Sequence, residues 1–295
     1  MAGVSSMIAP LHKVAVRAPG PSMLDADRAK WHYGPTFDPG RIGQDHKAFV
    51  ALLERAGADV LWMTGDDRGI ADAVFTYDAS LMTPEGAVLM SPGKSLRMGE
   101  QHLHAAFYKS QGIPVLGAIE GAGRIEAGDT LWLDDTTLAV GKGFRTNQEG
   151  CEQLAALLGN IGISAVDFDM PVYRGRDACL HLMSVVSLVA ERTALVCEEL
   201  MPVPLWILMQ EMGFTLLPAP FDEFDTSDTM SLNVLATAPG ECIAVDGFPK
   251  TKNLLEEAGI RVSVFDGTAL CIGAEGGPTC MTRPIERGTD SQQAA

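Results

Sequence analysis

The sequence predicts an α/β fold in which five similar ββαβ units close into a pseudo-symmetric ring. Three observations support this prediction. A helix–glycine–strand segment recurs five times, paired apolar runs lie between its copies, and a lone apolar strand stands near each end of the chain. Self-similarity at a near-constant period is typical of repeat architectures.

The recurring segment is recognised by a glycine between a helical run and a short apolar run. Its copies are ALLERAGADVLWM, FYKSQGIPVLGAI, ALLGNIGISAVDF, ILMQEMGFTLLPA and LLEEAGIRVSVF. The spacings between successive glycines are 55, 50, 51 and 46 residues, for Gly57, Gly112, Gly162, Gly213 and Gly259. A glycine at this place suits a left-handed helix C-cap, which side chains with a Cβ adopt only at a steric cost.

The segments between these copies predict hairpins, and the two ends of the chain predict the closure of the ring. Paired apolar runs turn at residues 84–86, at 134–135 and at 239–240. The run KVAVRAP near the start and CMTRPI near the end are unpaired strands, which we expect to pair with each other so that no open edge remains. We therefore expect one domain over residues 1–287 and a disordered tail over 288–295.

Composition excludes several classes of function. The net charge of −16 argues against nucleic-acid binding, and the sequence lacks the long apolar run of a membrane span. Its first residues do not resemble a secretory signal. The six cysteines are scattered without a C-x-x-C pair, so we expect free thiols in a reducing cytoplasm and no zinc site. The sequence leaves open whether the chain forms a homodimer.

Polar residues of catalytic type fall at matched places after the repeated glycines. Asp78 follows Gly57 by 21 residues, Glu126 follows Gly112 by 14, and His181 follows Gly162 by 19. Asn233 follows Gly213 by 20 residues, and Cys280 follows Gly259 by 21. Equivalent positions of a pseudo-symmetric ring point towards one place. We therefore expect a nucleophile, a base and carboxylates to share one cavity, which is what a covalent hydrolase requires.

The segments around these positions resemble the pentein superfamily of guanidino-group-modifying enzymes. They are GGPTCMTRPI (276–285), VGKGFRTNQEG (140–150), DAVFTYDASL (72–81), IEAGDTLWL (125–133) and LHLMSV (180–185). The resemblance is greatest to dimethylarginine dimethylaminohydrolases and extends to arginine deiminases. It implies a five-bladed α/β propeller of ββαβ units with pseudo-fivefold symmetry, in agreement with the repeat.

The resemblance also implies a role for each site residue. The catalytic residues are the nucleophile Cys280, the general acid and base His181, and Glu126, which orients His181. The substrate-binding residues are Asp78 and Asp72 for the guanidinium and Arg97 and Arg145 for the substrate carboxylate. The expected ligand is a small cationic guanidino compound, and the implied chemistry requires neither a cofactor nor a metal ion.

The substrate is less well determined than the reaction. Met183 stands where arginine deiminases have an aspartate two residues after the catalytic histidine. An apolar residue beside the leaving nitrogen would favour an N-methylated arginine, which gives citrulline and a methylamine. Arginine, in a deiminase or dihydrolase reaction, and another guanidino acid remain alternatives. A non-catalytic propeller that only binds a partner is a further alternative, and the loop at residues 31–34 could form a lid over the site.

Overall fold

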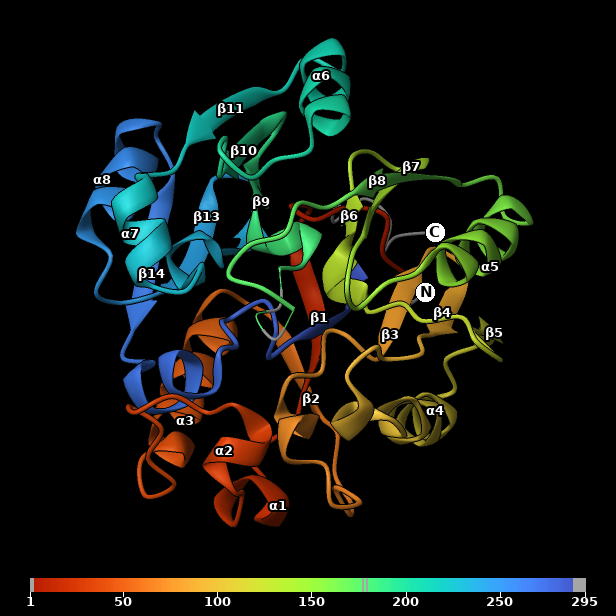
Figure 1. The fold of residues 1–295 in the computed structure, drawn as a ribbon, viewed down its shortest axis with the longest axis vertical. Helices are drawn as coiled ribbons and strands as arrows, with labels where there is room; N and C mark the ends of the chain where they lie inside the picture. Colours follow the sequence, from red (N-terminus) through yellow and green to blue (C-terminus); the bar gives the residue numbers. More distant parts are fainter. Residues whose placement is uncertain (1–2, 177, 179, 289–295) are drawn as a thin grey trace.

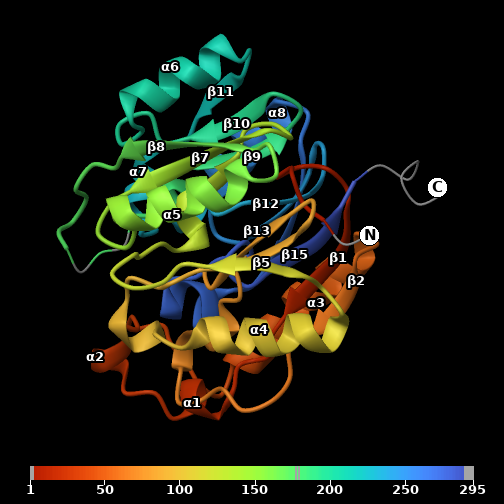
Figure 2. The same ribbon diagram turned by 90° about the vertical axis from the view of Figure 1, so that its right-hand side faces the viewer.

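The computed structural model describes residues 3–176, 178 and 180–288, and within these residues the strands form five three-stranded sheets. Each sheet combines one antiparallel and one parallel pairing. Figures 1 and 2 show the sheets arranged around the centre of the molecule with helices on the outside. The mixed α/β fold with five small sheets fits the predicted five-fold, propeller-like arrangement.

One unit illustrates how the sequence determines the repeat. Strands β3 (Ser80–Thr83) and β4 (Gly86–Leu89) form a hairpin around the predicted turn, and α4 (Glu100–Gln111) leads to β5 (Val115–Ala118), which runs parallel to β4. A parallel pairing needs such a crossover, whereas an antiparallel pairing needs only a tight turn. The ββαβ order of the unit is therefore the predicted one.

Three further units repeat this order. The second contains β6 (Thr130–Trp132), β7 (Thr137–Lys142), α5 (Gln148–Gly159) and β8 (Ser164–Asp169). The third contains β9 (Val186–Ala190), β10 (Thr193–Val196), α6 (Val203–Glu211) and β11 (Thr215–Pro218). The fourth contains β12 (Leu235–Ala238), β13 (Glu241–Val245), α8 (Pro249–Glu257) and β14 (Arg261–Phe265).

The fifth unit is assembled from both ends of the chain. Strand β1 (Leu11–Val16) pairs antiparallel with β15 (Arg283–Arg287) and parallel with β2 (Asp59–Trp62), which follows α3 (Ile42–Arg55). The prediction that the two ends pair inside one unit is confirmed. Short helices lie in the connections, namely α1 (Pro21–Leu24), α2 (Arg28–Trp31) and α7 (Phe221–Thr226). Apart from Gly288, the predicted disordered tail lies outside the described residues.

Burial distinguishes the inner strand of each sheet from the outer one. The first strand of each ββαβ unit (β3, β6, β9, β12 and β15) is almost wholly buried, whereas the last (β2, β5, β8, β11 and β14) is mostly half-buried or exposed. The five inner strands therefore surround the core, and the segments that enter them meet at the centre. No helix among the described residues has the length and apolar character needed to cross a membrane.

The repeated glycines adopt the left-handed conformation that the sequence predicts. Their φ angles are +89° at Gly57, +66° at Gly112, +77° at Gly162, +81° at Gly213 and +82° at Gly259. Each follows a helix and precedes the outer strand of its sheet. The glycines recur in the sequence because each one ends the helix of its unit in a left-handed backbone conformation. Only glycine takes this conformation without steric cost.

Two glycines of the same region should respond oppositely to alanine. Gly57→Ala should lower the free energy of unfolding by about 1 kcal/mol, because a Cβ is strained at a positive φ although the space around it is open. Gly43→Ala, inside α3 and equally uncrowded, should raise it by about 0.5 kcal/mol through helix propensity. Urea denaturation of both variants measures the two effects, and equal effects would contradict the assignment of a C-cap role to Gly57.

Candidate active site

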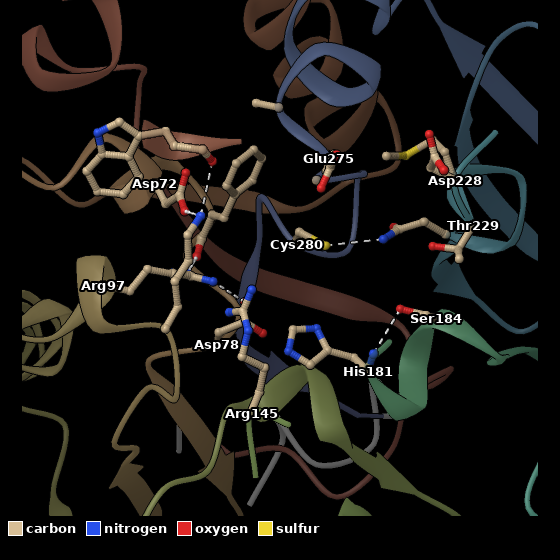
Figure 3. A pocket seen from close by; sticks show the side chains of 17 residues that line it. Asp72, Asp78, Arg97, Arg145, His181, Ser184, Asp228, Thr229, Glu275 and Cys280 are labelled. Atoms are coloured by element: carbon tan, nitrogen blue, oxygen red, sulfur yellow. Dashed lines mark hydrogen bonds and ion pairs between the residues drawn. The ribbon is translucent and has the colours of Figure 1, made fainter. Parts of the chain in front are cut away.

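A pocket lies where the segments entering the inner strands converge. Asp78 precedes β3, His181 precedes β9, Asn233 precedes β12 and Cys280 precedes β15, and all four line one cavity of about 110 Å³. Figure 3 shows the side chains of Asp78, His181 and Cys280 directed towards the same space. The convergence that was predicted from matched repeat positions is therefore present in the structure.

Cys280 is set apart from the other described cysteines by its access to this pocket. Of the five free thiols described, the other four are buried, whereas Cys280 is partly exposed and accepts a hydrogen bond at Sγ from Asn233 Nδ2 over 3.2 Å. Gly277 makes this contact possible, since a Cβ there would lie 2.4 Å from Cγ of Asn233. Burial and then the negative charge of Asp78 raise the pKa of the Cys280 thiol, while Asn233 and His181 oppose that rise.

The imidazole of His181 is held by a fully buried carboxylate. His181 Nε2 lies 2.8 Å from Oε2 of Glu126, which is 0% exposed, and the backbone N–H groups of Gly93 and Lys94 donate to Oε1 of Glu126 at 2.8 and 3.1 Å. Burial alone would raise the pKa of the Glu126 carboxyl. The hydrogen bond with His181 and the charge of Arg145 outweigh burial and hold this pKa below its usual range. Glu126 is therefore an anion at neutral pH.

Gly128 lies between the Asp78 carboxylate and the His181 ring, where there is no room for a side chain. Its N–H donates to Oδ1 of Asp78 at 2.9 Å, and a Cβ at this position would lie 2.7 Å from that oxygen and 2.7 Å from Nδ1 of His181. Real Cβ atoms essentially never approach neighbours so closely. The glycine of the segment IEAGDTLWL thus lets Asp78 and His181 stand side by side.

Arg97 lines the pocket, and its guanidinium is bound to two protein carboxylates. Its Nη1 donates to Oδ2 of Asp78, and its Nε and Nη2 form a two-pronged pair with Glu100, both at 2.8 Å. Nη2 also donates to the carbonyl of Phe75 at 3.0 Å. At 4% exposure, this guanidinium supports Asp78 from behind, although one edge of it lines the pocket. The role of Arg97 towards a substrate carboxylate stays a prediction.

Arg145 and Asp72 line the same cavity and also have protein partners. Arg145 Nη1 lies 3.2 Å from both carboxylate oxygens of Glu126. Asp72 accepts hydrogen bonds from the hydroxyl of Tyr33 at 2.7 Å and from Nζ of Lys94 at 2.7 Å. Their predicted roles in binding a substrate carboxylate and the guanidinium remain predictions.

The sequence did not point to Lys94, a further cationic residue that lines the pocket. Its Nζ binds Asp72, donates to the carbonyl of Trp31 at 3.3 Å and lies 5.3 Å from the centre of the Trp31 ring. No motif marked Lys94, although it stands only three residues before Arg97. The loop at 31–34 is anchored nearby, since Gly34 N–H donates to the carbonyl of Gly273 at 2.8 Å. Its function as a lid stays a prediction.

The placement of Met183 beside the leaving nitrogen is wrong. Met183 is 8% exposed, packs in the hydrophobic core and lines a separate cavity with Tyr77 and Trp132. The cause is the 3-10 turn at Leu182–Ser184 that follows His181. Residues three apart are eclipsed in such a turn, so Ser184 returns to the pocket while Met183 points away. The argument for a methylated substrate that rested on Met183 is therefore withdrawn.

Three polar side chains of the site could together hold a cation. Among the described residues, Asp78, Glu126 and His181 each place one potential ligand atom within 4.8 Å of the others, which marks the place as favourable to a cation.

Asp129 has a structural role, because its carboxylate accepts hydrogen bonds from Thr146 Oγ1 and from the N–H of Leu182. Burial raises the pKa of Asp129 to about 6.

Comparison with known proteins places the chain in a family. The model described as "N,N dimethylarginine dimethylhydrolase, eukaryotic" matches residues 40–205, which is more than half of the chain, and the arginine deiminase model matches residues 206–287. The chain belongs to the dimethylarginine dimethylaminohydrolase family. The family assignment places it among the hydrolases that act on C–N bonds of amidines, within the pentein superfamily.

Individual relatives resemble the chain over nearly its whole length. The N(G),N(G)-dimethylarginine dimethylaminohydrolase of Pseudomonas aeruginosa is 25% identical over 273 residues, which cover 91% of this chain and 97% of that protein. A solved structure of this enzyme, as a cysteine-to-serine mutant complexed with citrulline, superposes with a TM-score of 0.75 at 22% identity, covering 95% and 100% of the two chains. An amidinotransferase of the saxitoxin pathway from Microseira wollei shares the fold, with a TM-score of 0.80, 19% identity and 98% of each chain covered.

The pKa of Cys280 provides a test of the site that needs no substrate. The rate of Cys280 alkylation by iodoacetamide should rise with pH, reach half of its maximum at the elevated thiol pKa and level off above it, because the thiolate is the reactive form. Asp78→Asn removes a negative charge and should move this curve to lower pH by roughly one pH unit. Mass spectrometry of the peptide that contains Cys280 follows the reaction. Asp135→Asn, in the exposed β6–β7 turn, is the control, and an unshifted curve for Asp78→Asn would refute the electrostatic coupling.

Proposed function

We propose that this protein hydrolyses a guanidino compound to the corresponding ureido product, with Cys280 as the nucleophile. The observation that carries the proposal is the shared pocket of Cys280, His181 and Asp78, with Glu126 behind His181 at 2.8 Å. A thiol, a base with its own carboxylate partner and a further carboxylate in the pocket wall are the parts that covalent hydrolysis of a cation needs.

The proposed reaction proceeds in two displacement steps. The Cys280 thiolate attacks the central guanidino carbon, a C–S bond forms, and the C–N bond breaks as His181 protonates the departing amine. His181 then takes a proton from water, whose oxygen attacks the same carbon. The C–S bond breaks, a ureido product leaves, and the thiol returns to its starting state. The overall change consumes one water and releases one amine.

Electrostatics explain why this site suits a cationic substrate. Asp78 raises the pKa of the Cys280 thiol in the empty pocket. A bound guanidinium would offset the charge of Asp78 and so favour the thiolate at the moment of attack. Arg97 holds Asp78 in place from the buried side. The anionic Glu126 would stabilise the imidazolium form of His181 during proton transfer, as in other catalytic triads.

Three substrate classes are candidates. N-methylated arginine comes first, because the family model and the Pseudomonas relative carry that activity in their names. Arginine comes second, since the C-terminal part of the chain matches the arginine deiminase model. Another guanidino acid comes third. Transfer of the amidino group to an amine instead of water, and binding without catalysis, are the competing functions.

Incubation of the purified protein with asymmetric dimethylarginine, monomethylarginine and arginine tests the proposal. Ureido product should form from at least one of them. Cys280→Ser should reduce the rate by roughly 10³-fold or more, because the covalent step depends on this thiol. Cys151→Ser, at a buried thiol remote from the pocket lining, is the matched control. Product formation that survives in Cys280→Ser would contradict the mechanism, and amidino transfer to an added amine without ureido product would indicate a transferase.

Gly128→Ala tests the geometry independently of the nucleophile. The added methyl group should displace Asp78, His181 or both, and a displacement of about 1 Å at a reacting group typically costs about 10²-fold in rate. Ureido product formation measures the loss, and circular dichroism checks that the fold is kept. Gly159→Ala, with open space around its Cβ, is the control. Full activity of Gly128→Ala would show that the two side chains need not stand so close.

A further inference from the structure

A second cavity lies at the centre of the ring, next to the active-site pocket. Each unit lines it with its inner strand or with the segment that enters that strand, through Tyr77, Trp132, Ser187, Leu235 and Arg283. Thr279, which precedes the active-site Cys280 in the chain, lines it as well. We call this space the axial cavity. Its volume of about 20 Å³ suits one atom-sized occupant, since a single water molecule needs roughly 10–15 Å³ of such space.

Three buried polar atoms in the lining of the axial cavity have no hydrogen-bond partner within the described part of the chain. They are Nε1 of Trp132, Nε of Arg283 and Oγ1 of Thr279, whose residues are 2%, 2% and 4% exposed. The other two such atoms in that part belong to His46 and Ser231, which do not line this cavity. A buried donor without a partner is costly. Three of them around one small space indicate an occupant that accepts hydrogen bonds.

The axial cavity is also lined by two buried cations. Arg283 Nη1 donates to the carbonyls of Tyr77 and Ser80, and Arg287 donates to the carbonyls of Ala9 and Ala236 at 2.6 and 2.7 Å. Within the described residues, neither guanidinium forms an ion pair with a carboxylate. Carbonyl oxygens satisfy the N–H groups but leave both positive charges uncompensated, which is unfavourable in a buried place.

The two charges also act on each other. Burial lowers the pKa of the Arg287 guanidinium to about 10, and the nearby charge of Arg283 lowers it further. At neutral pH both groups are therefore still cations, and each would be stabilised by a negative charge placed between the inner strands.

The chemistry of the lining favours an anion over a water molecule. The indole N–H of Trp132 and the Nε–H of Arg283 can only donate hydrogen bonds. A water molecule accepts about two hydrogen bonds and must place two hydrogens of its own, whereas an anion accepts from every direction. The charges of Arg283 and Arg287 add an attraction that a neutral water molecule does not have. The small volume excludes polyatomic anions such as sulfate and leaves a monatomic one.

We propose that the axial cavity binds one small monovalent anion of the chloride class, held by the N–H groups of Trp132 and Arg283 and by the hydroxyl of Thr279. The anion offsets part of the positive charge of Arg283 and Arg287, and it joins β6 to β15 at the centre of the ring. The site is distinct from the pocket that contains Cys280. It is a binding site for an ion, and it does not depend on the proposed function.

Thermal unfolding of the full chain tests for this site. The protein is exchanged into sodium gluconate, whose anion is too large for the cavity, and is then titrated with sodium chloride at constant ionic strength. The Tm should rise and level off as the site fills. The rise should reach about 3 °C when chloride is at ten times its dissociation constant. A Tm that is independent of chloride, or that rises without levelling off, would overturn the proposal.

Substitution of Trp132 tests the place of binding. Trp132→Phe removes one donor and keeps an aromatic ring, so the chloride concentration that gives half of the Tm rise should increase roughly tenfold, because a hydrogen bond to a charged group is lost. Trp206→Phe, at a half-buried position of α6 outside the cavity lining, is the matched control and should leave that concentration unchanged. An unchanged value in Trp132→Phe would overturn the assignment.

The cations of the active-site pocket offer a competing place for chloride, which Lys94→Met tests. The chloride dependence of the Tm should persist in Lys94→Met, because Lys94 lines the active-site pocket and not the axial cavity. Its loss in Lys94→Met, together with an unchanged dependence in Trp132→Phe, would place the anion in the active-site pocket and overturn the proposal.

Bromide, a heavier anion of the same class, locates the site directly. Crystals of the wild-type protein grown in sodium bromide should show an anomalous scattering peak in the axial cavity, within hydrogen-bond distance of Trp132 Nε1 and Arg283 Nε. This measurement needs no variant, so it decides the question even where Trp132→Phe does not fold. A water molecule in the cavity, or an empty cavity, would overturn the proposal.

Discussion

The buried carboxylate of Glu126 is the interaction on which the rest of the site depends. A charge without access to water is costly unless cations and hydrogen-bond donors surround it. Here the donors come from three successive units of the fold: the N–H groups of Gly93 and Lys94 after β4, Arg145 after β7, and His181 before β9. The carboxylate therefore joins the units at their centre, and the position of the imidazole follows from that requirement.

A second buried carboxylate network stands beside the first. Asp78 receives Arg97 on its inner side and the N–H of Gly128 on its other oxygen, and Arg97 is in turn fixed by Glu100. Burial raises the pKa of Glu100 to about 8 even though Arg97 opposes the rise. The pocket is thus not a collection of free charges that await a substrate. Most of its charged groups already have a protein partner.

The thiol of Cys280 is placed in this environment without a strong activator of its own. Burial and Asp78 raise its pKa, and Asn233 offers one hydrogen bond to sulfur. Under the proposed function, the thiol stays largely protonated until a cationic substrate enters, so that reactivity and binding are coupled. In that proposal, the negative charge of Asp78 both raises the pKa of the thiol in the empty pocket and attracts the guanidinium of the substrate.

The sequence by itself determined the repeat, the pairing of the chain ends and the convergence of the polar positions. It could do so because the left-handed glycines after the helices and the buried inner strands impose a local pattern that recurs every fifty residues. Asp78, His181, Asn233 and Cys280 were found because they precede inner strands at matched places. The family resemblance supplied their expected roles, which spacing alone could not assign.

Only the tertiary structure decided which side chains face the pocket and which charges are already paired. Met183 lies next to site residues in the sequence, but the 3-10 turn after His181 directs it into the core and brings Ser184 to the cavity instead. Arg97 contacts Asp78 and Glu100, and Lys94 neutralises Asp72, through contacts between segments that no local pattern encodes. The physical reason is that periodicity fixes the backbone path, whereas charge pairing depends on distances between side chains from different units.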